Sequence, residues 1–250
     1  MKKYQEINSK TFDKWVKEGW TWGIPISTLD YQEAKKGNWS VLLTPTKPVP
    51  KEWFKDLKGK KVLGLGSGGG QQMPIFQALG AIVTCLDYSD EQLKSEQLVA
   101  RREGYQIRLI KADMTEPLPF EDNEFDLIFH PVSNVYIEKV EPVFKECFRI
   151  LKPGGILLSG LDNGLNFAFD DEEGKIAFKL PFNSLEDQEQ YDYMVKNDYG
   201  IQFSHDLSEQ IGGQLKAGFT LVDLYEDTNT EGKLKDYGIY TFTATKSVKL

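Results

Sequence analysis

A cluster of glycines between two apolar segments constrains this chain more than any other feature of its sequence. Residues 61–66 (KVLGLG) form a short apolar run, the loop Gly66-Ser67-Gly68-Gly69-Gly70 follows, and residues 73–79 have a spacing compatible with a helix. This order predicts a strand, a tight turn and a helix. Glycines in such a turn let the backbone approach a ligand where a Cβ would collide. The loop therefore predicts a ligand site, although dinucleotide-binding domains use a related loop.

Strand and helix patterns alternate along the rest of the chain. The strand patterns cover residues 61–66, 81–86, 106–110, 125–129, 156–159, 219–225 and 237–244. The helix patterns cover residues 73–79, 89–103, 135–151 and 204–217. Such alternation predicts an α/β fold, a Rossmann-like doubly wound and mostly parallel seven-stranded sheet with an antiparallel last strand and helices on both faces, in three α/β/α layers.

The chain is expected to form one domain, because no repeat, low-complexity tract or Pro/Gly-rich linker divides its 250 residues. Two stretches lie outside the regular alternation. Residues 1–50 hold four of the five tryptophans and are interpreted as an N-terminal aromatic-rich cap on a domain of residues 51–250. Residues 163–200 are acidic and aromatic, and their pattern over residues 165–180 predicts a β-hairpin. Both stretches are candidate lids.

Charge, hydropathy and cysteine usage disfavour several classes of function. The net charge of −8 disfavours binding to a phosphate backbone, so nucleic acid is not the expected partner. No stretch approaches the about 18 consecutive apolar residues of a membrane span and the first residues lack a signal-peptide core, which predicts a cytoplasmic protein. Cys85 and Cys147 lie in apolar patterns, and no spacing typical of metal ligands occurs. A monomer or a homodimer is expected.

Asp87 follows the second predicted strand, about 20 residues after the glycine loop. At this spacing an acidic side chain can accept hydrogen bonds from both ribose hydroxyls of an adenosine ligand. The residue therefore indicates an adenosine-containing cofactor without saying which one.

Four motifs in series make the chain recognisable: VLGLGSGGG, the acidic end of AIVTCLD, KADMTEPLPFEDNEFDLIF and FRILKPGGILL. Together they resemble the class I S-adenosylmethionine-dependent methyltransferases, in particular the type 11-like small-molecule group, over about residues 60–160. The resemblance implies methyl transfer from S-adenosylmethionine, with S-adenosylhomocysteine as product and no metal ion. It also implies that the turn Lys152–Gly155 is structural.

The resemblance also implies roles for individual residues. The loop would face the methionine part of the cofactor, Asp87 the ribose, and Tyr88, Asp113 and Met114 the adenine. The implied cofactor-binding residues are Gly66, Ser67, Gly68, Gly70, Asp87, Tyr88, Asp113, Met114 and His130.

One departure from the family pattern leaves two alternatives open. Many members carry an acidic residue where this chain has Gly64, which raises the alternative of a non-catalytic S-adenosylmethionine-binding or scaffold protein. An NAD(P)-dependent oxidoreductase would need a third glycine at the position of Gln71, counting from Gly66. Counting from Gly64 fits that pattern formally, but it places the first glycine inside the predicted strand.

The methyl acceptor is expected to be a small molecule bound beyond the carboxyl ends of the strands. Methyl transfer is an in-line displacement, so the enzyme mainly aligns the reactants and removes a proton where the acceptor requires it. His130, directly after the fourth strand, is the candidate catalytic base, although a histidine there can simply bond the backbone. Trp22, Asn134 and Tyr136 are candidate acceptor-binding residues.

Two further motifs receive no catalytic role. The run His130-Pro131-Val132-Ser133 is superficially similar to the Asn/Asp-Pro-Pro-aromatic loop of amino-group methyltransferases acting on DNA or glutamine, but its first and last residues differ. His205 opens a late helix, where capping and surface positions are the default expectation.

Overall fold

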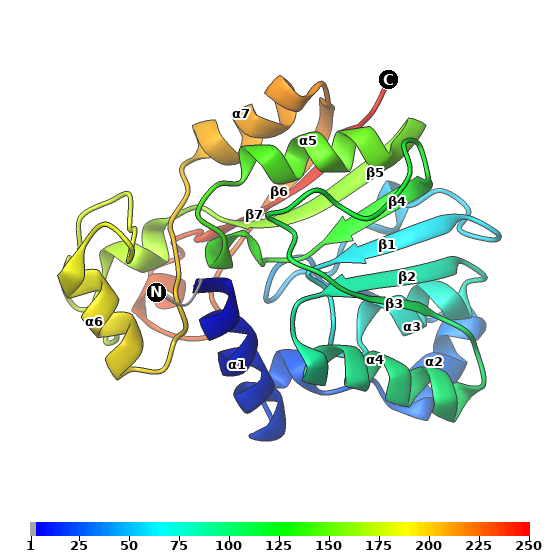
Figure 1. Ribbon diagram of the computed structural model, residues 1–250, viewed down its shortest axis with the longest axis horizontal. Helices are drawn as coiled ribbons and strands as arrows, with labels where there is room; N and C mark the ends of the chain where they lie inside the picture. Colours follow the sequence, from blue (N-terminus) through cyan, green and yellow to red (C-terminus); the bar gives the residue numbers. More distant parts are fainter. Residues whose placement is uncertain (1–3) are drawn as a thin grey trace.

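The computed structural model describes residues 4–250, and its seven strands form one mixed sheet in the order β3-β2-β1-β4-β5-β7-β6 (Figure 1). Only β7 runs antiparallel to its neighbours β5 and β6. The predicted fold class is confirmed. The strands are β1 (Lys61–Leu65), β2 (Ile82–Asp87), β3 (Arg108–Lys111), β4 (Phe125–His130), β5 (Leu151–Asp162), β6 (Thr220–Asp227) and β7 (Phe242–Val248).

Helices cover both faces of the sheet. On one face α3 and α4 pack on β1, β2 and β3, with α2 against α3 and α1 against α4. On the other face α5 packs on β5 and α7 on β6. The helices are α1 (Tyr4–Lys17), α2 (Thr28–Lys35), α3 (Gln72–Ala78), α4 (Asp90–Glu103), α5 (Glu141–Ile150), α6 (Gln188–Lys196), α7 (Leu207–Ala217) and α8 (Lys233–Asp236).

The strand pattern separates two hydrophobic cores. Val62 of β1 joins the core beneath α3 and α4, whereas Leu63 and Leu65 of the same strand join the core beneath α5. Successive side chains of a strand point to opposite faces, so a buried parallel strand needs apolar residues at every position. The apolar runs at residues 61–66 and 125–129 are therefore the sequence signature of the central strands.

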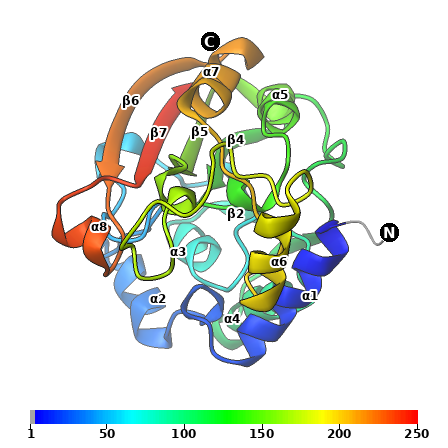
Figure 2. The same cartoon turned by 90° about the vertical axis from the view of Figure 1, so that its left-hand side faces the viewer.

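The carboxyl ends of the parallel strands meet at one edge of the sheet, and the segments outside the alternating pattern gather there. Figure 2 looks onto this end and shows α1 beside α6, with α8 on the opposite side. The amide of Asn8 on α1 and the backbone of Ile201 hydrogen-bond in both directions, at 2.9 and 2.7 Å. The N-terminal segment and the chain that directly follows the 163–200 insertion therefore contact each other.

The helix predicted at residues 135–151 begins later than expected. Its first part is the 3₁₀ turn Asn134–Tyr136 and a loop, and α5 itself starts at Glu141 with Pro142 in its first turn. Proline lacks an N–H donor and clashes with the preceding turn, so a helix tolerates it only at its start. The prediction overlooked this signal.

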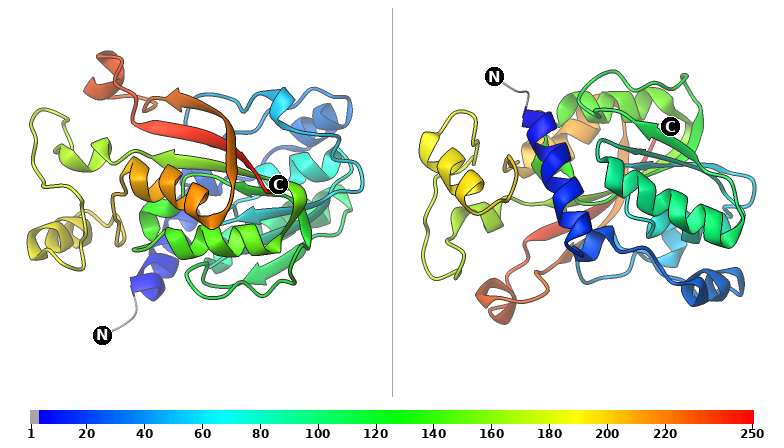
Figure 3. Two further views of the ribbon diagram at one scale, coloured as in Figure 1. Left: turned by 90° about the horizontal axis from the view of Figure 1, so that it is seen from above. Right: turned by 60° about the horizontal axis from the view of Figure 1, so that its bottom comes forward.

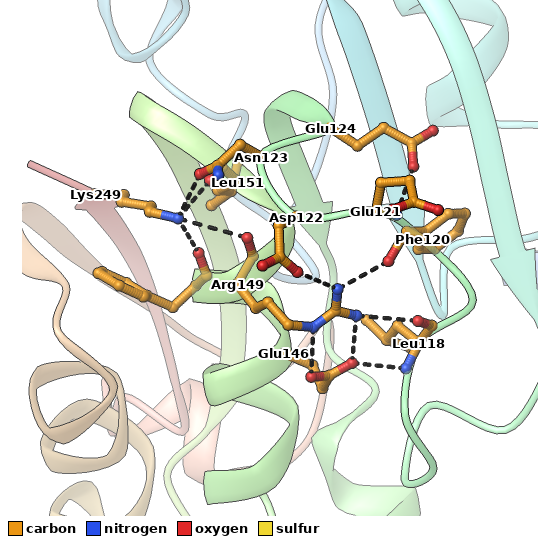
Figure 4. A network of polar contacts seen from close by, with 11 residues as sticks. Leu118, Phe120, Glu121, Asp122, Asn123, Glu124, Glu146, Arg149, Leu151 and Lys249 are labelled. Carbon is orange, nitrogen blue, oxygen red and sulfur yellow. Dashed lines mark hydrogen bonds and ion pairs between the residues drawn. The ribbon is translucent and has the colours of Figure 1, made fainter.

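Arg149 ties the end of α5 to the chain that leads into β4 (Figure 4). Its guanidinium donates to the carbonyls of Leu118 and Phe120, at 3.0 and 2.8 Å, and pairs with Glu146 and Asp122. One side chain thus satisfies backbone acceptors of a long loop that has no strand partner of its own.

Two strand predictions and one hairpin prediction need correction. β5 begins at Leu151, so the Lys152–Gly155 segment interrupts its pairing with β4 and does not precede it. β7 covers Phe242–Val248, and Tyr237 is 82% exposed outside it. The antiparallel last strand was predicted at residues 237–244, too early in the chain, because the buried face of β7 carries small polar residues, whose hydroxyls on Thr245 and Ser247 bond Gln214 of α7.

The predicted hairpin over residues 165–180 is largely absent. Residues Leu165–Ala168 form a 3₁₀ helix, and only one bridge, between Phe169 and Ile176, has antiparallel pairing. The alternation of apolar residues there reflects aromatic side chains that pack on one another, including Phe178 against Phe182, rather than a strand ladder.

Candidate active site

The glycine loop is held in place by acidic side chains of β2 and α4. Asp87, at the end of β2, accepts the amide N–H of Gly68 at 3.0 Å and that of Ser89 at 2.9 Å. Burial raises the pKa of this carboxyl, and the backbone donors partly offset the effect. Each carboxylate oxygen keeps a second lone pair for a ligand.

A second carboxyl, on α4, also holds the glycine loop. Glu96 on α4 is fully buried and accepts the amide N–H of Gly70 at 2.9 Å through Oε1. Among the described residues its other oxygen, Oε2, has no hydrogen-bond partner. Burial raises the pKa of Glu96 to about 8.

At two glycines in this region an added Cβ would come closer than van der Waals contact to a neighbouring atom. Gly69 has φ +98°, and a Cβ there would lie 2.4 Å from the backbone oxygen of Trp22. A Cβ at Gly64 would lie 2.8 Å from the methyl group of Met73. The space beside Gly64 is therefore filled by the Met73 side chain.

A small cavity of about 100 Å³ adjoins the loop. It is lined by Gly66 and by the predicted adenosine-site residues Asp87, Tyr88, Asp113 and Met114. The structure thus brings together residues from different segments that the sequence predicted separately.

Helix α1 covers this small cavity, lying between α6 and α4 (Figure 3). Ser9 donates to the carbonyl of Tyr88 at 2.8 Å, and Phe12 lines the cavity. Asp13 supports the N-terminus of α4, because its carboxylate accepts the hydroxyl of the N-cap Ser89 at 2.6 Å and the amide of Glu91 at 3.0 Å. Residues 1–3 of the predicted cap lie outside the described residues.

A larger cavity of about 510 Å³ lies beside the first. The two share lining residues at their junction, which are Trp20, Gly66, Gln92, Val132 and Tyr136. Trp22 and Ser67 line the larger cavity, as do Asp162 at the end of β5 and several aromatic residues of the insertion. A ligand beside the loop and a second ligand in the larger cavity would therefore meet near Gly66 and Tyr136.

His130 lies at the end of β4 but lines neither cavity. It is fully buried, with Nδ1 2.8 Å from the carbonyl oxygen of Leu65 and Nε2 2.7 Å from Oδ1 of Asn134. Burial lowers its pKa more than these contacts raise it. A general base needs a free nitrogen that faces the acceptor. This geometry does not support the predicted base role.

The contacts of His130 continue into α7 and back to β5. The Asn134 amide donates to Oε1 of Gln210 at 2.9 Å, and the Gln210 amide donates to the carbonyl of Asp162 at 2.6 Å. This His130–Asn134–Gln210 chain links the end of β1, under the glycine loop, to the wall of the larger cavity. Asn134, like Gly70, lines neither of the two cavities.

The surface position expected for His205 is wrong. Its side chain is buried, and Nε2 lies 3.1 and 2.9 Å from the carbonyls of Asn134 and Ile137. The helix cap is Asp206, whose side chain accepts the amide of Glu209 at 2.8 Å.

Several residues of the site were missed from the sequence. Gln92 is 7% exposed, lines both cavities, and its Oε1 has no hydrogen-bond partner in the described chain. A helical glutamine has no sequence signal that distinguishes it from a surface residue. Asp162 had one available signal, since it follows the strand predicted at residues 156–159 by three residues, near the carboxyl edge of the sheet.

Between residues 4 and 250, no three His, Cys, Asp or Glu side chains are grouped as metal ligands. No helix within these residues is both long and apolar enough to span a membrane.

Residues 63–159 match the protein family described as a methyltransferase domain. The uncharacterized methyltransferase YbaJ of Bacillus subtilis (strain 168) is 43% identical over 250 residues, which cover 97% of each chain. A sterol 24-C-methyltransferase of Aspergillus fumigatus is 36% identical over 102 residues, 40% of this chain and 27% of that protein. The glycine/sarcosine/dimethylglycine N-methyltransferase of Actinopolyspora halophila is 31% identical over 127 residues, 50% of this chain and 22% of that protein.

Solved structures share the fold. An S-adenosylmethionine-dependent methyltransferase from Mesorhizobium loti aligns with a TM-score of 0.61 at 17% identity, covering 79% of this chain and 94% of that one. A protein from Listeria monocytogenes, described as a putative enzyme of the same kind, gives the same TM-score and identity, covering 80% and 94%.

Proposed function

The chain belongs to the class I S-adenosylmethionine-dependent methyltransferases, and from this premise we propose that it methylates a small molecule bound in the larger cavity. The observation that carries the proposal is the junction of the two cavities at Gly66 and Tyr136. One cavity adjoins Asp87 and the adenosine-site residues, and the other is large enough for a separate ligand. In-line transfer needs the two reactants aligned end to end, which this arrangement suits.

The residues of the small cavity fit the cofactor. Asp87 would accept the ribose hydroxyls, Met114 and Tyr88 would pack against the adenine, and Gly66 would lie beside the methionine part. The orphaned oxygen of Gln92 supports a bound group that donates a hydrogen bond, such as the cofactor's ammonium. When bound, S-adenosylmethionine supplies an electrophilic methyl group and leaves as S-adenosylhomocysteine, and such a displacement requires no metal ion.

Cofactor binding is testable at Asp87. Asp87→Ala should weaken S-adenosylmethionine and S-adenosylhomocysteine binding by about 10- to 100-fold, because charge-assisted hydrogen bonds to a carboxylate contribute about 1.5–3 kcal/mol. Isothermal titration calorimetry would measure both affinities. Asp90→Ala is the matched control, since Asp90 pairs with Lys111 at the surface and lines neither cavity. Folded wild-type protein that binds neither ligand would contradict the proposal.

Residues 1–50 act in our proposal as a cap over the cofactor, and residues 163–200 as a lid over the acceptor. Asn8 of the cap and Ile201, which directly follows the lid, hydrogen-bond to each other in both directions. These bonds support movement of the cap and the lid as one unit. Asn8→Ala should speed S-adenosylhomocysteine dissociation about fivefold, since it removes about 1 kcal/mol of net hydrogen bonding from the closed state. Stopped-flow displacement would measure the rate, with the exposed Lys10→Ala as control. Equal rates in wild type and Asn8→Ala would refute the coupling.

A further inference from the structure

We infer that the methyl acceptor is an amine, which enters the larger cavity as a cation and is methylated on nitrogen. The inference rests on the proposed function and adds the chemical class of the acceptor. Charge, aromatic lining and the position of Asp162 each support it.

The charge of the cavity wall has one sign. Four carboxylates line it, and within the described part of the chain no lysine, arginine or histidine does. The acidic residues are Asp162, Asp170, Asp171 and Glu173. Lys175 and Lys233 lower the pKa of Asp170, after the larger effect of backbone hydrogen bonds, but contribute nothing to the lining. A phosphate or carboxylate ligand would meet repulsion here, whereas a cation would be attracted.

Aromatic faces provide the second feature that suits a cation. Ring quadrupoles attract an ammonium group within about 6 Å of the ring centre. Tyr193 and Tyr199 also donate their hydroxyls to the Asp171 carboxylate, which places its charge beside the rings. The aromatic residues that line the cavity are Trp20, Trp22, Tyr136, Phe167, Phe178 and Tyr193, among others.

Asp162 is the carboxylate best placed to hold the reacting nitrogen. It is 5% exposed, and it accepts the Gly164 amide and the Asn166 side chain, each at 2.7 Å. No cation of the described chain pairs with it, so its charge is buried without a partner. Buried charges are normally paired, which makes a cationic ligand its natural counterion.

Asp162 lines the larger cavity, which meets the small cavity at Tyr136. Its negative charge raises the pKa of Tyr136, a residue that lines both cavities, after the larger effect of burial. Gln92 adds a buried, unpartnered hydrogen-bond acceptor to the same junction. A nitrogen near Asp162 would therefore lie close to the site where the cofactor's methyl group is expected.

The reaction balances with groups already named. The ammonium first gives its proton to the Asp162 carboxylate, which leaves a neutral amine with a free lone pair. That lone pair forms the N–CH₃ bond while the S–CH₃ bond breaks, and the bonding electrons leave on sulfur as S-adenosylhomocysteine. Asp162 then releases its proton to solvent with the product. Burial raises the pKa of Asp162 to about 6, which makes it a stronger base than an ordinary aspartate.

The test compares three ligands with one apolar body and different head groups. 2-Phenylethylamine, 2-phenylethanol and 3-phenylpropionate are titrated into the full-length protein saturated with S-adenosylhomocysteine, with Trp20 and Trp22 as fluorescent reporters. We expect the amine to bind at least tenfold more tightly than the alcohol, and the carboxylate most weakly. Asp162→Asn should reduce the amine's advantage at least fivefold, whereas Asp122→Asn, whose carboxyl is exposed beside Arg149, should leave it unchanged.

Several outcomes would overturn the inference. They are equal or tighter binding of the alcohol or carboxylate, no binding of any of the three ligands, or an amine preference that survives Asp162→Asn. If Asp162→Asn does not fold, the exposed Asp171→Asn takes its place, with a smaller loss expected. Failure of S-adenosylhomocysteine to saturate the protein would instead refute the proposed function, so the two failures are distinguishable.

Discussion

Gly160→Ala should lower the free energy of unfolding by about 3 kcal/mol, because the added methyl group has no space. Gly160 lies buried in β5, and its Cβ would stand 1.9 Å from the carbonyl oxygen of Leu43. That carbonyl accepts the amide of Val132 at 3.3 Å, so moving it would also disturb a hydrogen bond across the larger cavity's wall. Thermal unfolding should shift down by about 6–12 °C.

Gly212→Ala is the control, because here the same substitution should raise the free energy of unfolding. Gly212 lies inside α7, and a Cβ there would meet nothing within 4 Å. Alanine in a helix is favoured over glycine by about 0.5–1 kcal/mol, so this variant should gain stability. Equal melting temperatures for Gly160→Ala and wild type would show that Leu43 can shift without cost, contrary to the expectation.

Glu96→Gln should remove a stability loss that the wild type suffers as the pH rises. In the unfolded chain Glu96 ionises near the usual glutamate pKa of 4.5, whereas burial raises the folded-state pKa to about 8. Between these values the folded state holds one proton more than the unfolded state, so wild-type stability falls with pH. The slope is about 1.4 kcal/mol per pH unit, and above pH 8 the loss levels off.

Chemical denaturation at about pH 5, 6.5 and 8 would measure this difference. The stability of Glu96→Gln relative to wild type should rise by about 3–4 kcal/mol between the first and last values, as an upper estimate. Other titrating groups are common to both proteins and cancel. Glu91→Gln on the same helix is the control. Lys94 and Lys17 lower the pKa of Glu91, so the stability of this variant relative to wild type should fall, not rise, as the pH increases through that pKa. Parallel pH curves for Glu96→Gln and wild type would rule out a buried protonated carboxyl.

Local signals account for the part of the fold that was predicted well. Between β1 and α4, each boundary has its own marker, such as the glycine loop, the Ser89 N-cap and Gly104 in the left-handed conformation at the end of α4. β7 has no such marker. The polar residues on its buried face are satisfied by Gln214, which lies about 30 residues away in the sequence and bonds two hydroxyls that would otherwise be buried without partners.

The candidate site likewise contains residues that the sequence could predict and contacts between distant segments that it could not. Asp87 was predicted because it ends a strand about 20 residues after the glycine loop, whereas the roles of Tyr88, Asp113 and Met114 were implied only by the resemblance to the methyltransferase family. The contacts of buried His130 could not be predicted, since they depend on Asn134, whose amide is held by Gln210 of α7, 76 residues further along the chain. The N-terminal segment was expected to be a cap, but the contacts of α1 could not be predicted, because they join segments far apart in the sequence, as Asn8 does with Ile201.

The His130–Asn134–Gln210 chain has a consequence for proton counting. It begins and ends at backbone carbonyls, of Leu65 and Asp162, which can only accept hydrogen bonds. Four contacts therefore need four protons, whichever way the two amides are turned, and a neutral imidazole leaves only three. The lowered pKa of His130 favours that neutral ring, so one contact goes without its hydrogen. The His130–Asn134–Gln210 chain thus has one hydrogen-bond donor too few, and protonation of the imidazole would supply it. This chain lies between the end of β1 and the wall of the larger cavity.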